Sequence, residues 1–489
     1  MCYNWAVTKK RLKSTRPFIL ILVFVVITLL AFFGFQFFTK TGIFFVPGVV
    51  NYDESLNEEE IAKLKSIFTE DVVLNRDVTI SAFETETRPE LSENEVLTEI
   101  LVPVADYYTV ESDVSELSSD LVSEIPLEEL DYTKKLLSKN DQYFLDDFNT
   151  GATFRVLKFE SEAFNDEIKP LIHDLSKTFP DKETVLTFAQ TGVTALSRGM
   201  NAKLSQVGDA RYFSEKIAGF LSGFDLTHTS NESSFSESAN SENICSDPRF
   251  IDTLNAIGLD IVELTGNHNE DCGDEAAKSS IDIYNQNNIK TVGGGKTAEE
   301  AALPLQISEK GNNITFLAYN LSTGGATHDA TPGANQYYEE TAASDIKTAK
   351  DRGDFVIVDV QYYECSAYAS EYEDPTCDRA DSAAGNQVGL FRHLIDLGAD
   401  MVVGTSAHQP QTYELYGNGV IYYGLGNLFF DQIWWPGTTR SLILANYFYN
   451  GKLLQTKIVP TVYDSNMQTK LLDKDTAKWF LERLMKVRP

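Results

Sequence analysis

Basic residues are few for the length of the chain. Its 489 residues include 41 Lys and Arg against 72 Asp and Glu, which gives a formal net charge of −31. Nucleic-acid binding needs a basic surface that neutralises phosphates, so this composition argues against a nucleic-acid partner. An acidic surface is expected to keep an exposed protein soluble. Any acidic ligand would have to be bound at a local basic or metal-bearing cleft.

Cysteine is also scarce, with five residues and no C-x-x-C spacing, which disfavours a zinc site. Apart from Cys2, the cysteines form an even-numbered set that suits an oxidising compartment: Cys245, Cys272, Cys365 and Cys377. Four cysteines allow three pairings. We prefer Cys245 with Cys272, which would join two polar loops, and Cys365 with Cys377, which would close a short acidic loop.

The chain has one long uncharged apolar run, residues 17–38, preceded by five basic residues between Lys9 and Arg16. At about 1.5 Å per helical residue, this run can cross a hydrocarbon core of about 30 Å. No small-x-small cleavage site follows it, so an uncleaved signal anchor is expected. Its rival is a buried core helix. The prediction is a single-pass cell-membrane protein with a cytoplasmic basic tail (residues 1–16), a transmembrane segment (17–38) and an extracytoplasmic remainder.

Residues 41–180 are acidic and alternate between helical and strand-like patterns. Strands are expected at residues 77–83, 96–104 and 154–159, with helices within 51–70 and at 164–178 and further acidic helix-forming stretches between 104 and Phe148. These patterns predict a small α+β region or folded stalk, whose function the sequence does not indicate.

After Pro180 the pattern changes to regular alternation of strands and helices. Strands are expected at 184–189, 226–229, 261–264, 290–292, 314–319, 355–358 and 401–403, and helices at 210–221, 248–257, 276–284, 339–352 and 387–397. Such alternation predicts a layered α/β domain over residues 183–465, with helices on both faces. Turns at 416–420 and 449–452 predict closing antiparallel strands. A helix at 476–487, within a C-terminal segment 466–489, ends the chain.

The most informative stretch is residues 261–273, IVELTGNHNEDCG. A β-branched apolar run ends at Gly266, polar side chains follow, and a helix is expected soon after Gly273. Because ligands bind at the carboxyl ends of strands in α/β sheets, Asn267, His268 and Asp271 are candidate site residues. The alternative is a helix N-cap by Asn269 or Asp271 beside a surface histidine.

Other expected strand ends carry similar polar side chains. They lie at residues 191–193, 230–233, 361–364, 404–408 and 423–430. The motifs in these loops, together with Leu397-Gly398-Ala399-Asp400 and Tyr423-Gly424-Leu425-Gly426-Asn427, resemble in order and spacing those of the CapA/PgsA family. That resemblance implies a membrane-anchored protein of capsule or poly-γ-glutamate synthesis. It also implies a layered sandwich of the calcineurin-like metallophosphoesterase type.

Several metal-ligand positions of that family are replaced in this chain. Val193 stands where the family has aspartate, Gln361 where it has histidine, and Thr405 with Ser406 where it has paired histidines. The resemblance leaves a reduced set of candidates with different roles. The expected ligands of a divalent Mn, Zn, Mg or Fe ion are Glu232, Asn267, His268 and His408; the expected catalytic groups are His268, Asp271 and Glu364; and the expected substrate-binding residues are Asn231, Gln361, Asn427 and Trp434.

Two functions remain open. The first is a metal-dependent hydrolase, in which a cation activates a bound water. The second is a catalytically degenerate relative that binds an anionic surface polymer, or its synthase or export complex in the membrane, without turnover. Individual residues also keep plain alternatives: Glu232 as a solvated charge, His408 as a turn residue and Trp434 as a packing residue.

Overall fold

The computed structural model describes residues 47–178, 180–321, 331–362, 386–434 and 436–486. The expected transmembrane segment, Glu364 and the pair Cys365 and Cys377 lie outside these ranges. Within them, no helix is long and apolar enough to cross a membrane. The chain forms two compact units. Of the described residues, the smaller contains 47–84, 90–98 and 155–177, and the larger contains 85–89, 99–154 and those that follow 177.

In the smaller unit, β1 (Val50–Tyr52) pairs in parallel with β2 (Val78–Thr85), and α2 (Glu58–Ile67) begins at a capping box. The expected helix at 164–178 is wrong. The chain instead forms a π-helical turn, Phe164–Ile168, and a 3-10 turn, His173–Leu175. Pro170 explains the break, because proline lacks the N–H that a continuing helix needs.

Residues 99–154 of the larger unit contain more extended chain than expected. The antiparallel partners of β3 (Glu95–Asp106) are β4 (Ser123–Pro126) and β5 (Lys134–Leu136). In place of long acidic helices there are short 3-10 turns and α3 (Phe144–Asp147), before β6 (Thr153–Glu160). Asp113 shows the reason: its carboxylate accepts from the backbone N–H of Ser115, and such local bonds compete with helix formation.

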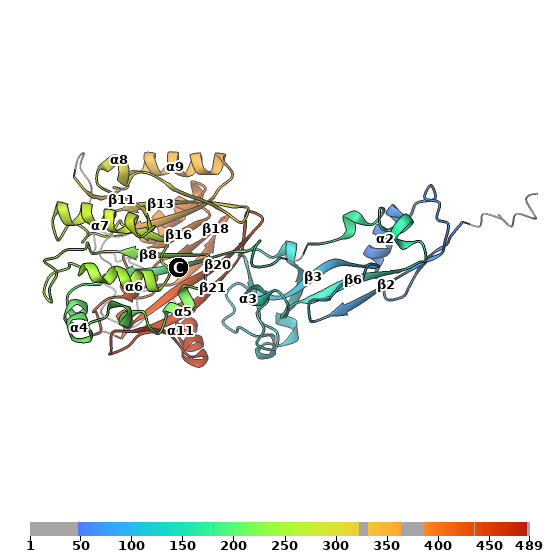
Figure 1. Cartoon of the computed structure of the whole chain (residues 1–489), viewed down its shortest axis with the longest axis horizontal. Coiled ribbons are helices and arrows are strands. Elements are labelled where there is room, and N and C mark those ends of the chain that lie inside the picture. The colour runs from blue at the N-terminus through green and yellow to red at the C-terminus, as the bar shows by residue number, and fades with distance from the viewer. Residues whose placement is uncertain (1–46, 179, 322–330, 363–385, 435, 487–489) are drawn as a thin grey trace, which may run out of the picture. The chain divides into compact units, whose positions relative to one another are not determined.

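The rest of the larger unit contains two mixed sheets (Figure 1). The first sheet consists of β7 (Leu186–Thr194), β8 (Leu226–Asn231), β9 (Ile261–Glu263), β10 (Lys290–Val292), β19 (Asn427–Phe429), β20 (Arg440–Tyr449), β21 (Lys452–Tyr463) and β22 (Thr469–Leu471). Its strand order is β10-β9-β8-β7-β20-β21-β22, and β19 also pairs with β7. The second follows the order β12-β13-β15-β16-β18-β17 and consists of β12 (Leu305–Glu309), β13 (Asn312–Asn320), β15 (Phe355–Gln361), β16 (Met401–Gly404), β17 (Tyr413–Tyr416) and β18 (Gly419–Tyr422). Strands β7 to β10 are mutually parallel, as are β13, β15, β16 and β18.

Helices cover the outer faces of both sheets. The first sheet packs against α4 (Gly199–Val207), α5 (Ala218–Leu221), α6 (Ile251–Ala256) and α7 (Asp274–Gln286), and the second packs against α9 (Glu339–Asp351) and α10 (Gln387–Asp396). A separate apolar cluster lies between the two sheets and includes Phe188, Ile261, Phe316 and Ile357. The layered α/β prediction is therefore confirmed. The short helix α8 (Ala298–Ala301) and the terminal helix α11 (Lys474–Lys486) complete the unit, with a small pairing of β11 (Gly294–Gly295) and β14 (Gly333–Ala334).

A polar cluster interrupts the apolar layer between the sheets. The amide of Gln190 on β7 donates to Asp359 on β15 over 2.6 Å, and Nε2 of His228 on β8 lies 3.1 Å from the other oxygen of Asp359. Glu263 on β9 is also fully buried and accepts from the backbone N–H of Thr265. Burial, with a smaller contribution from the charge of Asp359, raises the pKa of Glu263 to about 7.

Replacing Glu263 by Gln is expected to flatten part of the pH dependence of stability. Because the pKa of Glu263 is raised from about 4.5 to about 7 on folding, the folded chain holds a proton that the unfolded chain releases between these values. That stabilisation is complete below pH 4.5 and is lost as the pH rises through 7. Between pH 5 and 8 the unmodified protein should lose on the order of 2 kcal/mol more than Glu263→Gln in urea unfolding. Equal slopes would contradict the prediction. Glu270, whose pKa is also raised, contributes to both proteins.

Candidate functional site

The site lies where strands from both sheets end on the same side. In the first sheet, Val193 on β7 is in register with Ser230 on β8 and with Asn427 on β19. Gln361 is the last residue of β15 in the second sheet. Glu232, Asn267 and His408 follow β8, β9 and β16, so sequence reasoning placed them correctly at strand ends.

Gln361 joins the two sheets at this edge. Its amide nitrogen lies 3.4 Å from Oε1 of Glu232 and 3.2 Å from Oδ1 of Asn267, and its carbonyl oxygen lies 3.5 Å from the hydroxyl of Thr405. Glu232, Gln361 and Thr405 are buried. We refer to Glu232, Asn267, Gln361, Thr405 and His408 as the Gln361 cluster. Glu232 is therefore not a solvated surface charge.

His408 is oriented by Asn427. The Asn427 amide nitrogen donates to the carbonyl oxygen of Thr438 over 3.1 Å, so its own carbonyl oxygen faces His408 Nδ1 at 2.9 Å. Since that oxygen can only accept, Nδ1 carries a proton. Nε2 of the same ring lies 3.9 Å from Oε2 of Glu232. His408 thus belongs to the cluster, and Asn427, expected to bind substrate, positions it.

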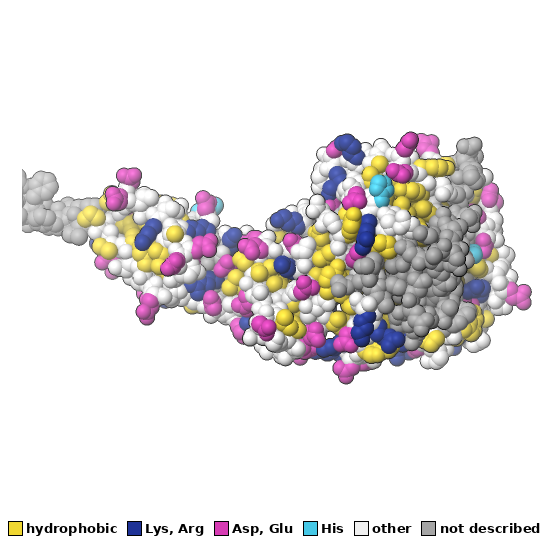
Figure 2. All heavy atoms as spheres, turned by 180° about the vertical axis from the view of Figure 1, so that it is seen from behind, with side chains coloured by type: hydrophobic (Ala, Val, Ile, Leu, Met, Phe, Trp, Pro, Cys, Tyr) yellow, Lys and Arg dark blue, Asp and Glu magenta, His cyan; other side chains and the backbone are white. Residues whose placement is uncertain are grey.

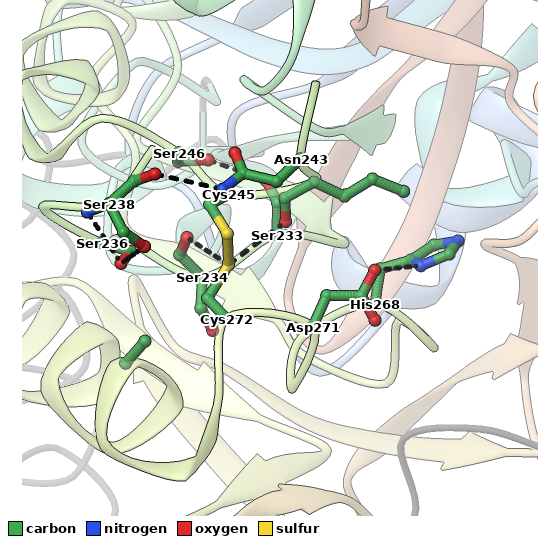
Figure 3. Close-up of a disulfide and its surroundings, with 12 residues drawn as sticks. Ser233, Ser234, Ser236, Ser238, Asn243, Cys245, Ser246, His268, Asp271 and Cys272 are labelled. Carbon is green, nitrogen blue, oxygen red and sulfur yellow. Dashed lines mark hydrogen bonds and ion pairs between the residues drawn. A yellow bond between two sulfur atoms is a disulfide. The ribbon is translucent and has the colours of Figure 1, made fainter. Parts of the chain in front are cut away.

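His268 and Asp271 form a more exposed pair beside the cluster. His268 Nδ1 lies 2.9 Å from Asp271 Oδ2, and the two side chains are 25% and 41% exposed (Figure 3). The alternative, an N-cap by Asn269 or Asp271, is wrong, because Gly273 occupies the cap of α7 with a φ of 87° and no side-chain bond. Asn269 instead donates to the backbone carbonyls of Asn231, Leu264 and Gly266, which fixes the loop.

A disulfide between Cys245 and Cys272 holds the same loop, which confirms the preferred pairing (Figure 3). It joins the segment after β8 to the segment before α7. A close approach adds to this constraint: a Cβ on Gly266 would lie 2.8 Å from the Cα of Glu232, so glycine is required there. The Asn267 loop is therefore fixed against the Glu232 loop by covalent and steric constraints.

The cluster is a poor fit for the two-cation centre of a metallophosphoesterase. Among the residues that the structure describes, no group of three or more His, Cys, Asp and Glu side chains is arranged to hold a metal ion. Val193, at the position of the family's aspartate, is buried and apolar. The Gln361 amide nitrogen lies between two oxygens that would otherwise serve as cation ligands.

Two expected substrate-binding residues have different surroundings. Asn231 is buried, and its amide donates to the carbonyl oxygen of Ser233 over 2.7 Å, which is a loop-stabilising bond. Trp434 is 65% exposed and therefore does not serve only as core packing. Ser406 is buried and donates to the carbonyl oxygen of Tyr362.

Arg198 and Asp431 lie near the cluster and were not predicted from the sequence. Arg198 pairs with Asp431 at 2.5 Å and lies over the ring of Phe430 at 4.7 Å, and that ring lies 5.3 Å from the ring of His408. A guanidinium is therefore held one ring away from the cluster. The available signal was only Asp431 directly after two phenylalanines, which is too common a pattern to predict a contact.

Comparisons with known proteins cover the part of the chain that contains this site. Residues 187–432 match the family model described as bacterial capsule synthesis protein PGA_cap. The capsule biosynthesis protein CapA of Bacillus anthracis is 25% identical over 45% of this chain and 55% of its own length. The PGA biosynthesis protein CapA of Bacillus subtilis (strain 168) is 28% identical over 40% of this chain and 49% of its own length.

The chain thus spans about half the length of these curated relatives. A crystal structure of TT1561 of Thermus thermophilus aligns with 55% of this chain and all of its own at 12% identity, with a TM-score of 0.31. The match of half the chain to one family model, together with two CapA proteins of capsule and PGA biosynthesis, gives the assignment. This chain belongs to the bacterial capsule synthesis protein family PGA_cap.

Proposed function

We propose that this chain acts in capsule or poly-γ-glutamate biosynthesis as a membrane-anchored, extracytoplasmic protein that binds the anionic polymer at the Gln361 cluster without cleaving it. The relatives' names supply the biosynthetic context. The apolar run at 17–38 supports the anchor, and the Cys245–Cys272 disulfide supports an oxidising compartment outside the cytoplasm.

One observation supports binding of the polymer without hydrolysis. The Gln361 amide donates toward Glu232 and Asn267, so a neutral group occupies the place that a bridging cation needs. Hydrolysis by this fold depends on cations that lower the pKa of a bound water and stabilise developing charge. A neutral amide supplies neither effect. It does supply, with Asn267 and Thr405, hydrogen-bonding groups suited to the amides and carboxylates of a polymer backbone.

A partly exposed basic side chain lies near the site. Arg198 is held one ring away from His408 by its pairing with Asp431 and its contact with Phe430. Because the whole chain has a large excess of acids, attraction of a polyanion has to be local, and Arg198 would exchange its partner Asp431 for a carboxylate of the polymer. Trp434, three residues after Asp431 in the sequence, offers an exposed ring.

The proposal is tested with the full chain in a nonionic detergent and fluorescent poly-γ-glutamate as the probe. We expect saturable binding with no shortening of the polymer. Asn267→Ala should weaken binding by about 10-fold to 100-fold, because a lost hydrogen bond to a charged group costs about 1.5–3 kcal/mol. Asn285→Ala, at an exposed position on α7, is the matched control and should bind normally. Shortening of the polymer by the unmodified protein would refute the non-hydrolytic function.

A second function, a hydrolase with one cation, is favoured by a single distance. Oε2 of Glu232 and Nε2 of His408 are 3.9 Å apart, and a divalent ion bonds such oxygens and nitrogens at about 2.0–2.2 Å. A cation held there would polarise an oxygen of the substrate. Elemental analysis of the unmodified chain and of His408→Ala separates the two functions: near-stoichiometric metal that is lost in the variant supports the hydrolase, and no metal in either supports the binding protein.

A further inference from the structure

A cavity lies within the larger unit, apart from the Gln361 cluster. It has a volume of about 340 Å³. Its walls come from the chain that follows β3, from β5 and the loop before α3, from β17 and β21, and from α11. Cavities of this size are at the lower end of the range that binds small molecules.

Lys135 on β5 is the distinctive charge of this cavity. Its ammonium donates to the backbone carbonyl oxygens of Thr109 at 2.7 Å and Val110 at 3.0 Å, both neutral acceptors. An ammonium has three N–H donors, so one remains for a further acceptor. Among the described residues, Lys135 has no carboxylate within 4.0 Å. Burial lowers its pKa to about 8, partly offset by the charges of Glu111 and Glu116 and reinforced by Lys478.

The other three lysines of the cavity already have carboxylate partners. Lys457 pairs with Asp146 at 3.2 Å, Lys474 with Glu116 at 2.8 Å and Lys478 with Glu111 at 3.1 Å. Four lysines and three carboxylates line the cavity, and Glu111, the partner of Lys478, is a fourth carboxylate of the region. The charges are therefore balanced here, whereas acids greatly outnumber bases in the whole chain. Lys135 differs from the other three lysines in being held by carbonyl oxygens, so it is the lysine at which an incoming anion would be placed.

Positive and negative side chains are mixed on the surface of the described chain that Figure 2 shows. On the face shown in Figure 2, lysine and arginine side chains are interspersed with acidic ones over the described residues. Long-range attraction of an anion by such a surface is weak, so an anion has to be recognised by a specific group. Lys135 provides that group inside a cavity, where pairing is less screened than at the surface.

The rest of the lining combines polar side chains, such as those of Ser112 and Gln455, with apolar and aromatic ones. The rings of Tyr107 and Tyr413 meet edge to face with centroids 5.9 Å apart, and Leu136, Ile458 and Leu481 add aliphatic surface. A ligand that fills this space therefore needs an apolar body as well as its charged end. A hydrated inorganic anion would leave the apolar wall uncovered.

We propose that this cavity binds a small organic monocarboxylate, whose carboxylate pairs with Lys135 and whose apolar body packs against Tyr107 and Tyr413. This site is independent of polymer binding at the Gln361 cluster. Protonated Lys135 is required, so binding should weaken as the pH rises above about 8.

The probe is 3-phenylpropionate, titrated calorimetrically into the full chain in a nonionic detergent, with 3-phenylpropionamide as the neutral counterpart and inorganic phosphate as the second anion. We expect saturable binding of the carboxylate, at least tenfold weaker binding of the amide, and at least tenfold weaker binding of the carboxylate to Lys135→Met. Lys347→Met, which removes an exposed lysine on α9, should bind as the unmodified protein does.

A second variant guards against a folding defect in Lys135→Met. Ala477→Phe on α11 adds a ring to the cavity wall, leaves Lys135 in place and should also abolish binding. Absence of saturable carboxylate binding up to about 10 mM would overturn the proposal. So would equal binding of the amide, unchanged binding by both cavity variants, or binding of phosphate alone.

Discussion

Asp359→Ala is expected to lower the free energy of unfolding by about 3 kcal/mol or more, among the largest effects of a single change in this chain. Asp359 is fully buried between the two sheets, where it accepts from Gln190 and lies 3.1 Å from His228. Removing its carboxylate leaves the buried amide donor of Gln190 without its acceptor and takes away the charge beside the buried imidazole of His228. In the folded variant this amide is buried without that acceptor, whereas in the unfolded chain it forms hydrogen bonds with water, so the variant is less stable.

The measurement is urea unfolding at pH 7, with Asp359→Asn as the matched variant. Asparagine keeps an acceptor oxygen for Gln190 and nearly the same volume, so its loss should be clearly smaller than that of alanine. If the two variants lose the same free energy, the acceptor is not what this position contributes. A loss below about 1 kcal/mol for Asp359→Ala would show that the cluster rearranges or admits water.

Removing the disulfide with Cys245→Ser and Cys272→Ser together is expected to cost about 3.5 kcal/mol. The cross-link closes a loop with a sequence separation of 27, and a loop of that length restricts the unfolded chain by roughly this amount. A second effect is expected at the Gln361 cluster. Cys272 lies in the loop that carries Asn267, so its release should also weaken polymer binding.

Urea unfolding with and without dithiothreitol measures the first effect. With Cys365 and Cys377 replaced by Ser in both proteins, so that only the Cys245–Cys272 bond can be reduced, reduction should bring the parent protein to the stability of the double variant and should leave the double variant unchanged. Cys2→Ser is the control and should behave as the unmodified chain, since Cys2 is remote in sequence from the cross-linked loop. A double variant as stable as the unmodified protein would mean that native contacts, such as those of Asn269, hold the loop without the cross-link.

The α/β core was predictable because its strands are short apolar runs between turn signals. The expected strand at 290–292 coincides with β10, and the expected helix at 339–352 matches α9 to within one residue. Prediction failed where side-chain hydrogen bonds to the nearby backbone compete with a continuous helix. The expected helix at 210–221 is split into the 3-10 turn Ala210–Phe213 and α5, with Asp209 capping the first piece.

The residues of the candidate site could be predicted from the sequence, but their arrangement in space could not. Polar residues after apolar strands pointed to Glu232, Asn267, Gln361 and His408, because parallel strands bring their carboxyl ends to one edge. The position of the Gln361 amide between Glu232 and Asn267 depends on how the two sheets face each other. Similarly, Asn427 was expected to contact substrate, whereas its bond to His408 follows from a parallel pairing of β19 with β7 that no local pattern encodes.

The placement of residues 99–154 in the larger unit has a consequence for chimeric proteins. The family match covers residues 187–432, but the folded core of that unit extends past both of these limits. Tyr107 meets the hydroxyl of Tyr422 at 3.2 Å, and Asp146 accepts from the hydroxyl of Tyr447 at 2.7 Å. A transplant of residues 187–432 between relatives would therefore cut through shared packing. The exchangeable module is the whole larger unit, including residues 99–154. Grafts of this whole unit should remain soluble, whereas grafts of residues 187–432 alone should aggregate.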